Sequence, residues 1–190
     1  MSKRRESISD ELAAWIKQQQ IFFVATAPLA VDGHINCSPK GGDSFRVLGP
    51  MEVAYQDYTG SGAETAAHLR ENGRIAIMFC AFSGSPTIVR LHGTGRVVTP
   101  KDPGFTELAA HFPPHPGTRA LIYVAVERVS DSCGYSVPFY DFKARRDALD
   151  KWAANKGEVG LAEYRSLKNQ KSIDQLPAFD ANESPSRQTE

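Results

Sequence analysis

Residues 57–69, DYTGSGAETAAHL, have the types and the spacing of a loop that could hold an anion. Thr59, Ser61 and Thr65 offer hydroxyl donors, and Gly62 lets a ligand approach the backbone closely. The loop leads directly into a short amphipathic pattern that predicts a helix. The first turn of a helix has free N–H groups and the positive end of the helix dipole, so these residues are typical of a phosphate-binding helix start.

The same loop also fits a purely structural role, and the two interpretations stay open. Ser61 and Glu64 have the S-x-x-E spacing of a capping box, in which hydroxyl and carboxylate each accept a hydrogen bond from a free backbone N–H. The negative charge of Glu64 would repel a phosphate. A phosphate site therefore requires Glu64 to turn away and a cation to arrive from elsewhere, and we expect both.

Two basic residues on predicted strands are the candidates for that cation. Lys40 follows the strand 34–38 in the segment SPKGG, whose two glycines keep the loop low. Arg90 lies between Val89 and Leu91 and points to the opposite face of its strand, where an arginine needs an anion or water. Each has an ordinary alternative: a solvated surface lysine, or an arginine on an exposed strand face.

Other residues with reactive side chains do not form a convincing site. His111 and His115 have i, i+4 spacing, but the two prolines between them prevent the helix that would place both on one face, so no metal site is predicted. Cys37, Cys80 and Cys133 are odd in number and widely spaced. Their pattern predicts reduced thiols rather than a disulfide framework or a zinc site.

The elements that must position these residues are mostly strands with short connections. Apolar or alternating runs predict strands at 21–27, 34–38, 45–48, 51–57, 74–82, 86–98 and 118–126. Helices are predicted at 9–20, from the loop to Asn72-Gly73, near 102–111, and from 141 to 157. Strands without regular alternation with helices predict a mainly-β antiparallel barrel with peripheral helices, in which 74–82 is central.

Length and composition limit the architecture and the partners. With 190 residues, 41% of them hydrophobic, we expect one barrel domain at 1–140, a helical extension at 141–178 and a disordered tail at 179–190. Lys+Arg and Asp+Glu both total 22, which disfavours nucleic acid as a partner. No apolar run approaches the roughly 20 residues of a membrane span, and the N-terminus lacks an apolar signal core, so a cytoplasmic protein is expected.

Four segments together carry a resemblance to a known family. They are SPKGG at 38–42, YTGSGAETAAHL at 58–69, RIAIMFCAF at 74–82 and IVRLHGTGRV at 88–97. Their order resembles the FMN-binding split-barrel family typified by pyridoxamine 5′-phosphate oxidase, over roughly residues 10–140. The resemblance implies a six-stranded barrel, a homodimer, and two FMN molecules at the subunit interface, with the end of the strand 34–38 along the flavin.

The resemblance also implies which residues contact the cofactor, and where this chain departs from the family. Together with the loop and the two cations, it gives the predicted FMN contacts Asn36, Ser38, Lys40, Thr59, Ser61, Gly62, Thr65 and Arg90. Where the family's oxidases place a Ser-Arg-Lys run that grips phosphate, this chain has Ala63-Glu64-Thr65. The vitamin B6 substrate is therefore not carried over.

The expected function is that of an FMN-binding, flavin-dependent oxidoreductase whose electron donor and substrate are small molecules. No residue has to act as an acid, a base or a nucleophile, because the flavin supplies the electron chemistry. The catalytic residues are left unassigned, and so is turnover itself. The alternatives are a non-catalytic flavin sensor or storage module, a relative that binds the deazaflavin F420, and a structural dimer without a cofactor.

Overall fold

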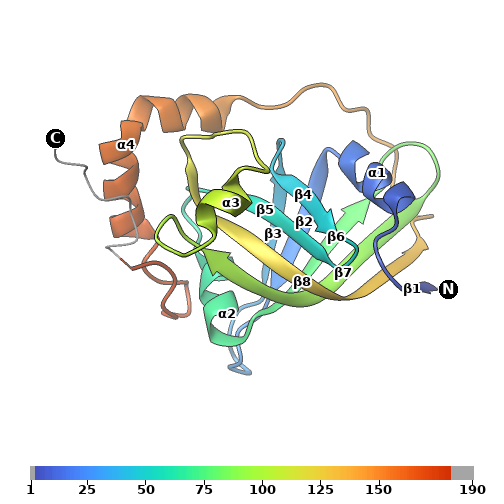
Figure 1. Cartoon of the computed structure of the whole chain (residues 1–190), viewed down its shortest axis with the longest axis horizontal. Coiled ribbons are helices and arrows are strands. Elements are labelled where there is room, and N and C mark those ends of the chain that lie inside the picture. Colours follow the sequence, from blue (N-terminus) through green and yellow to red (C-terminus); the bar gives the residue numbers. More distant parts are fainter. Residues whose placement is uncertain (1–2, 181–190) are drawn as a thin grey trace.

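The computed structural model describes residues 3–180, and these form an antiparallel sheet that curls into an open barrel with helices at its rim (Figure 1). The strands are β1 (Lys3–Arg5), β2 (Ile21–Thr26), β3 (Asn36–Gly41), β4 (Phe45–Gly49), β5 (Glu52–Tyr58), β6 (Arg74–Cys80), β7 (Thr87–Val98) and β8 (Thr118–Cys133). They pair in the order β3-β2-β6-β7-β8-β5-β4, and β1 adds to β8. The predicted mainly-β class with an antiparallel, barrel-like sheet is confirmed.

The sheet contains eight strands where a six-stranded barrel was expected. Part of the difference is at the far end of β8, which continues seven residues beyond the predicted end at 126. Val129 in this extension is fully buried, and β1 pairs with it, Arg5 opposite Val129. The polar residues around Val129 concealed this strand from a pattern search.

The core fills the concave side of the sheet. Strand β6 places Ile75, Ile77 and Phe79 inward, with exposures of 5%, 0% and 1%, as its predicted central position requires. The ring of Phe22 from β2 lies 5.7 Å from that of Phe79, and Phe45 from β4 lies 5.1 Å from Phe79. Burying such side chains contributes on the order of 2 kcal/mol each, so this aromatic cluster joins both halves of the curled sheet.

Two of the helices begin and end near the predicted positions. Helix α1 (Asp10–Gln18) is capped by Ser9, whose Oγ accepts a hydrogen bond from the backbone N–H of Leu12 at 3.3 Å. Helix α2 (Glu64–Asn72) ends at Gly73, which adopts the predicted left-handed conformation with φ of 72°. The short helix near 102–111 is α3 (Phe105–Ala109).

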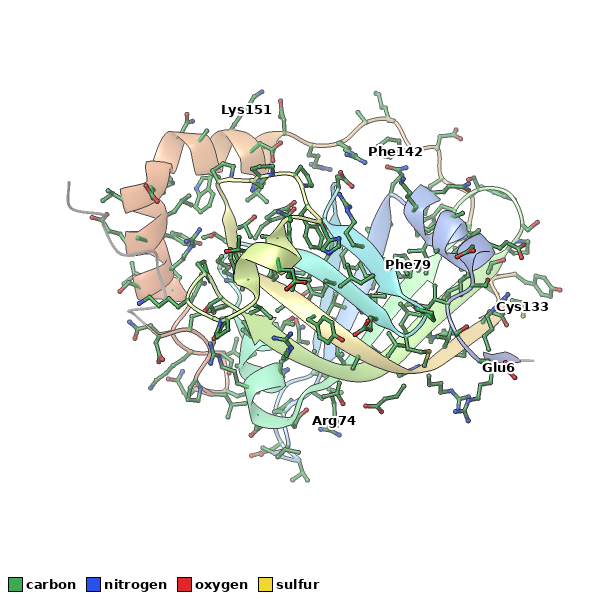
Figure 2. All side chains as sticks on the ribbon, viewed as in Figure 1. Glu6, Arg74, Phe79, Cys133, Phe142 and Lys151 are labelled. Carbon is green, nitrogen blue, oxygen red and sulfur yellow. The ribbon has the colours of Figure 1, made fainter. Side chains whose placement is uncertain are left out.

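The prediction of a helix from 141 to 157 is wrong in its bounds. Residues 141–147 have no helical structure, and all of them are exposed. Helix α4 (Ala148–Lys168) starts later, bends at Gly157 and buries Ala153 and Leu161. A short helix is stable in water only when it packs an apolar face, and 141–147 has none to pack. Figure 2 shows Phe142 of this segment on the outer side of the fold, whereas Phe79 lies within it.

No helix among residues 3–180 combines the length and the apolar character needed to cross a membrane. The predicted disordered tail falls mostly on residues 181–190, which lie outside the described part of the chain.

Candidate functional site

Three polar residues on β3 point into the fold from the edge of the sheet. Asn36, Ser38 and Lys40 are partly buried, while Cys37 and Pro39 between them are exposed, as the period of two in a strand requires. Because β3 ends the strand order, its outer edge has no strand partner among the described residues. This corner thus combines an inward polar row with an open backbone edge.

The polar row continues into α2 through a chain of hydrogen bonds. Ser38 Oγ donates to Asn36 Oδ1 at 2.8 Å, and Asn36 Nδ2 donates to Thr65 Oγ1 at 3.0 Å and to Thr26 Oγ1 at 3.2 Å. Thr26 Oγ1 lies 2.9 Å from Nδ1 of His68, a fully buried side chain whose pKa is lowered by that burial. The structure thus brings together three of the predicted residues, Asn36, Ser38 and Thr65, but their polar groups largely satisfy one another.

Lys40 ends the row in a buried ion cluster. Its Nζ lies 3.0 Å from Oδ1 of Asp57, and Arg119 Nε lies 2.7 Å from Oδ2 of the same carboxylate. Asp57 is 1% exposed. Burial alone would raise the pKa of Asp57, but the charges and hydrogen bonds of Arg119 and Lys40 outweigh it and hold the pKa at about 2. Asp57 is therefore ionised at neutral pH.

Arg119 reaches Asp57 because the pairing of β5 with β8 is irregular. Asp57 pairs with Ala120 and Tyr58 pairs with Thr118, which leaves Arg119 as the extra residue of a β-bulge. A bulge re-aims the side chain that it carries. Without it, regular alternation would turn the guanidinium to the other face of β8.

A third cation comes from α4. Arg165 Nε donates to Thr59 Oγ1 at 2.8 Å, and Nη2 donates to the carbonyl oxygen of Thr118 at 3.2 Å. Thr59 is 1% exposed, and its hydroxyl donates to the Gly117 carbonyl at 2.9 Å. Thr59 was predicted to contact the ligand, but its hydroxyl forms hydrogen bonds inside the fold, and one of them positions Arg165. Burial, together with the nearby charge of Arg119, lowers the pKa of Arg165.

The corner carries an excess of positive charge. Lys40 and Arg119 both bind the single carboxylate of Asp57, which leaves one positive charge uncompensated in this cluster. Arg165 lies near Arg119, whose charge lowers its pKa, and Glu158 is the acid that favours charged Arg165. Nη1 of Arg119 is buried and has no hydrogen-bond partner within residues 3–180. Buried cationic donors are costly unless an anion meets them, so these residues fit a dianion such as a phosphate monoester.

The loop before α2 does not form the capping box. The helix is preceded by Ala63, which provides no side-chain cap, and Ser61 is exposed. Glu64 Oε1 accepts a hydrogen bond from the Ile173 N–H at 3.3 Å, yet Oε2 stays beside Gly62, where an added Cβ would lie 2.6 Å from it. The expectation that Glu64 turns away is therefore wrong. Its charge disfavours an anion over Gly62 and favours the side of Lys40.

The C-terminal segment 169–179 covers this loop. Asn169 Nδ2 donates to the Gly60 carbonyl at 2.8 Å, and the ring of Phe179 lies 4.9 Å from the Arg119 guanidinium. The segment packs on alanines of the loop, of α2 and of β8: Ala63, Ala66, Ala67 and Ala120. It is also held at Asp174, which accepts hydrogen bonds from His34 through its backbone N–H and its ring Nδ1.

Arg90 does not join the site within one chain. It pairs with Ser130 on β8, ten positions beyond Ala120, and its Nη1 donates to Ser132 Oγ at 3.0 Å. At about 3.3 Å per strand residue, Arg90 lies on the order of 30 Å from the cluster.

Three residues of the site were not predicted: Asp57, Arg119 and Arg165. Asp57 gave one usable signal, because it is an acid at the buried end of a strand pattern, directly before the loop. Arg119 and Arg165 gave none, since one depends on a bulge and the other lies beyond the predicted end of its helix. Within residues 3–180, no three His, Cys, Asp or Glu side chains come together as a metal site.

The protein is an open antiparallel barrel with a cluster of cations near its edge strand β3. Comparison with known proteins identifies its family. Residues 8–133 match the family model of pyridoxamine 5′-phosphate oxidase. The pyridoxamine 5′-phosphate oxidase family protein ustO of Aspergillus flavus is 42% identical over 193 residues, covering 92% of this chain and 76% of that protein. The chain belongs to the pyridoxamine 5′-phosphate oxidase family.

Solved structures support the same fold. HupZ of Group A Streptococcus has a TM-score of 0.51 and 24% identity, over 64% of this chain and 91% of that one. A candidate pyridoxamine 5′-phosphate oxidase of Lactobacillus delbrueckii has a TM-score of 0.52 and 21% identity, over 67% and 98%. At these identities the likeness concerns the fold alone.

Proposed function

We propose that the chain binds FMN and acts as a flavin-dependent oxidoreductase. The phosphate lies against the cluster of Lys40, Asp57 and Arg119, and the flavin ring runs along the open edge of β3. Family membership supports the cofactor class. FMN supplies the electron-carrying ring when bound, while the residues of the chain hold its phosphate and limit the access of water.

The observation that carries this proposal is the charge balance of the corner. Lys40 and Arg119 share one carboxylate, Arg165 lies near Arg119, and Arg119 keeps a buried N–H donor without a partner among the described residues. Lys40 is the most accessible of the group's acid-paired cations, with 23% of its side chain exposed against 6% for Arg119. A phosphate can reach Lys40 without unfolding the cluster.

We do not extend the proposal to a vitamin B6 phosphate as the substrate. Position 64 holds a glutamate whose carboxylate lies beside the loop, at a place where the family's oxidases carry basic residues. A second phosphate-bearing ligand would meet that charge. We therefore propose a small-molecule electron donor and an acceptor that lacks a phosphate group at this position.

A homodimer is part of the proposal. Four large side chains after β8 are exposed: Tyr135 82%, Phe139 80%, Tyr140 65% and Phe142 56%. Several exposed aromatic side chains in one short segment are typical of a surface that another chain covers. A second copy lying there is compatible with a flavin site completed by both chains.

Lys40→Gln is expected to raise the Kd for FMN about tenfold and the Kd for riboflavin less than twofold. Loss of one charge-assisted contact to phosphate costs about 1.5 kcal/mol, whereas riboflavin has no phosphate to lose. Quenching of flavin fluorescence measures both affinities. Arg128→Gln, which removes an exposed positive charge eight positions beyond Ala120 on β8, is the control. Equal losses for the two ligands would show that Lys40 acts on the fold and not on phosphate.

Turnover is tested on the same protein. We expect the purified chain, saturated with FMN, to lose its flavin absorption near 450 nm during anaerobic titration with NADPH or NADH, since a flavin oxidoreductase must accept electrons from a donor. A protein that binds FMN tightly but is not reduced by either nucleotide, nor by other small donors, would instead support the sensor or storage module.

A further inference from the structure

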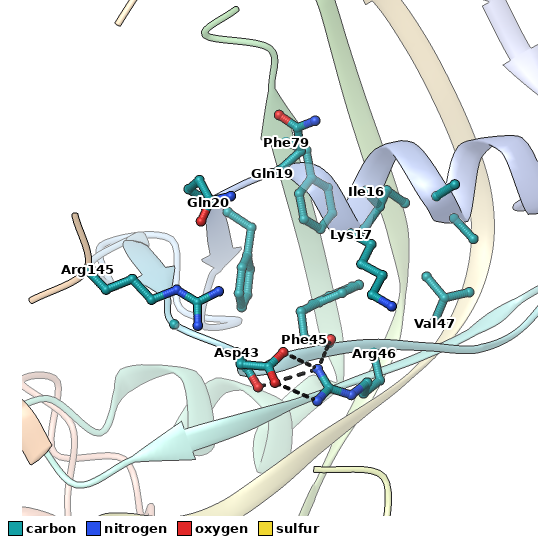
Figure 3. A pocket seen from close by; sticks show the side chains of 14 residues that line it. Ile16, Lys17, Gln19, Gln20, Asp43, Phe45, Arg46, Val47, Phe79 and Arg145 are labelled. Carbon is teal, nitrogen blue, oxygen red and sulfur yellow. Dashed lines mark hydrogen bonds and ion pairs between the residues drawn. The ribbon is translucent and has the colours of Figure 1, made fainter. Parts of the chain in front are cut away.

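A pocket lies between α1 and β4, on the other side of Phe22 from the residues proposed to bind FMN. It has a cavity volume of about 480 Å³ and is enclosed by α1, the start of β2, β4 and the segment that carries Arg145 (Figure 3). None of the eight predicted cofactor residues lines it. The volume falls within the roughly 300–1,000 Å³ of small-molecule sites.

The inner wall of this α1–β4 pocket is aromatic. Phe45 and Phe22 meet edge to face with ring centroids 5.0 Å apart, and Phe45 meets Phe79 in the same way at 5.1 Å. Phe22 and Phe79 are buried, whereas Phe45 is only partly covered. The pocket therefore offers an aromatic surface that is already fixed by its own packing and accessible at Phe45.

The rim of the pocket is cationic, and two of its three cations are free. Arg46 is committed, because its Nη1 and Nη2 bind the two carboxylate oxygens of Asp43 at 2.8 and 3.1 Å, and its Nε donates to a backbone carbonyl. The side chains of Lys17 and Arg145 are exposed and make no hydrogen bond or ion pair with another residue of 3–180. The pocket thus holds two uncompensated positive charges.

The charges of the rim act on the pocket together. The hydrogen bond from Arg46 lowers the pKa of Asp43 against the effect of burial, and the charges of Arg46, Arg145 and Lys17 lower it further. Lys17 and Arg145 are therefore close enough to stabilise a negative charge at this position. Figure 3 shows the three basic side chains arranged around the phenylalanine rings.

We propose that the α1–β4 pocket binds a small aromatic carboxylate of one or two rings. The ring system packs on Phe45, and the carboxylate lies between Lys17 and Arg145. A neutral aromatic would leave both cations without a counter-ion, and an aliphatic acid would leave the aromatic wall in water. The pocket shares no residue with the proposed FMN site, but Phe22 of its wall pairs with Lys40 across β2 and β3.

The test uses 2-naphthoate and its neutral analogue 2-naphthylmethanol, titrated by calorimetry into the full chain saturated with FMN and into the chain without it. We expect 2-naphthoate to bind at micromolar to millimolar concentration in both forms. Lys17→Gln/Arg145→Gln should weaken 2-naphthoate about tenfold and leave the alcohol within twofold, because two partly exposed charge contacts are lost. The control Arg146→Gln/Lys168→Gln removes the same charge outside the pocket and should change neither affinity.

A second variant locates the ligand. Ala14→Trp adds a large side chain at an exposed position of α1 that lines the pocket, and it should abolish binding of both compounds. The proposal is overturned if the Lys17/Arg145 variant binds 2-naphthoate as the unchanged chain does. It is also overturned if saturating FMN displaces 2-naphthoate, or if Ala14→Trp changes only the self-association of the chain.

Discussion

Replacing Asp57 by asparagine is expected to lower the free energy of unfolding by about 3–5 kcal/mol, because removal of one partner of a buried ion pair leaves the other uncompensated. In this cluster two partners are affected, since Lys40 and Arg119 each bind one oxygen of the carboxylate. Arg119 is 7% exposed and lies at the start of β8, so its charge stays buried when the carboxylate is removed. Urea unfolding of the FMN-free chain measures the loss.

Asp43→Asn is the matched control. Asp43 also binds an arginine through both oxygens, but 55% of its side chain is exposed, so its loss should cost less than about 1 kcal/mol. If the two variants are equally stable, burial does not determine the strength of the Asp57 cluster. The double variant Asp57→Asn/Arg119→Gln should recover at least about 1 kcal/mol relative to the sum of the single losses, which identifies the pair as coupled.

The Asp57 cluster also makes the free energy of unfolding depend on pH in the acidic range. The pKa of Asp57 is about 2 in the folded chain against 3.8 for an ordinary aspartate, so the carboxylate is stabilised by folding. A lowered pKa contributes stability that is complete above the unfolded value and is lost as pH falls toward the folded one. The contribution, roughly 2 kcal/mol, should therefore disappear between about pH 4 and pH 2, and Asp57→Asn should lack this part of the pH dependence.

The sequence was sufficient for the central strands of the sheet because their inward residues are consistently apolar. Ile75, Ile77 and Phe79 alternate with less buried residues, and Val89 and Leu91 do the same on β7. Their alternation predicts both the strands and the face that each buries. The loop before α2 was also recognised from residue types. The strand predicted at 34–38 is displaced, because β3 is Asn36–Gly41 and contains Lys40; the structure brings Lys40, Asn36, Ser38 and Thr65 to one corner.

The charge balance of the site could not be read in the same way. Arg119 depends on one extra residue in β8, and a one-residue irregularity turns a side chain to the opposite face. Arg165 depends on how far α4 extends and on where its bend at Gly157 directs the second half. Both are set by tertiary packing, so local patterns predicted the position of the loop but not which cations would meet there.

The segment 169–179, which covers the site, was predicted incorrectly for a related reason. The segment 169–179 has no regular secondary structure beyond an isolated bridge between Lys171 and Pro177, and its polar composition resembles that of the tail that follows. Its order comes from a few specific contacts, chiefly those of Asn169, Asp174 and Phe179. Phe179 was assigned to the disordered tail, yet it is 8% exposed.

Phe179→Ala is expected to lower the free energy of unfolding by about 3 kcal/mol, the usual loss when a buried phenylalanine is truncated. The ring packs with the alanines at the start of α2 and stacks against the Arg119 guanidinium, so the variant removes an apolar contact and a cation–π contact together. Urea unfolding measures the loss, and Leu167→Ala, which truncates a 77% exposed side chain outside the proposed dimer surface, should cost less than about 0.5 kcal/mol.

The same substitution should open the cover before the barrel unfolds. Without the ring, segment 169–179 keeps its polar contacts to the loop and only the smaller apolar contacts of Leu176 and Ala178, and the polar contacts are weak when water competes for them. Hydrogen exchange should therefore accelerate at least tenfold for the amides of 59–62 and 170–178, while those of β6 and β7 change only with global stability. Uniform acceleration across the sheet would show that Phe179 supports the whole barrel rather than the cover. Under selective opening, FMN should associate faster, because the cover lies over Arg119.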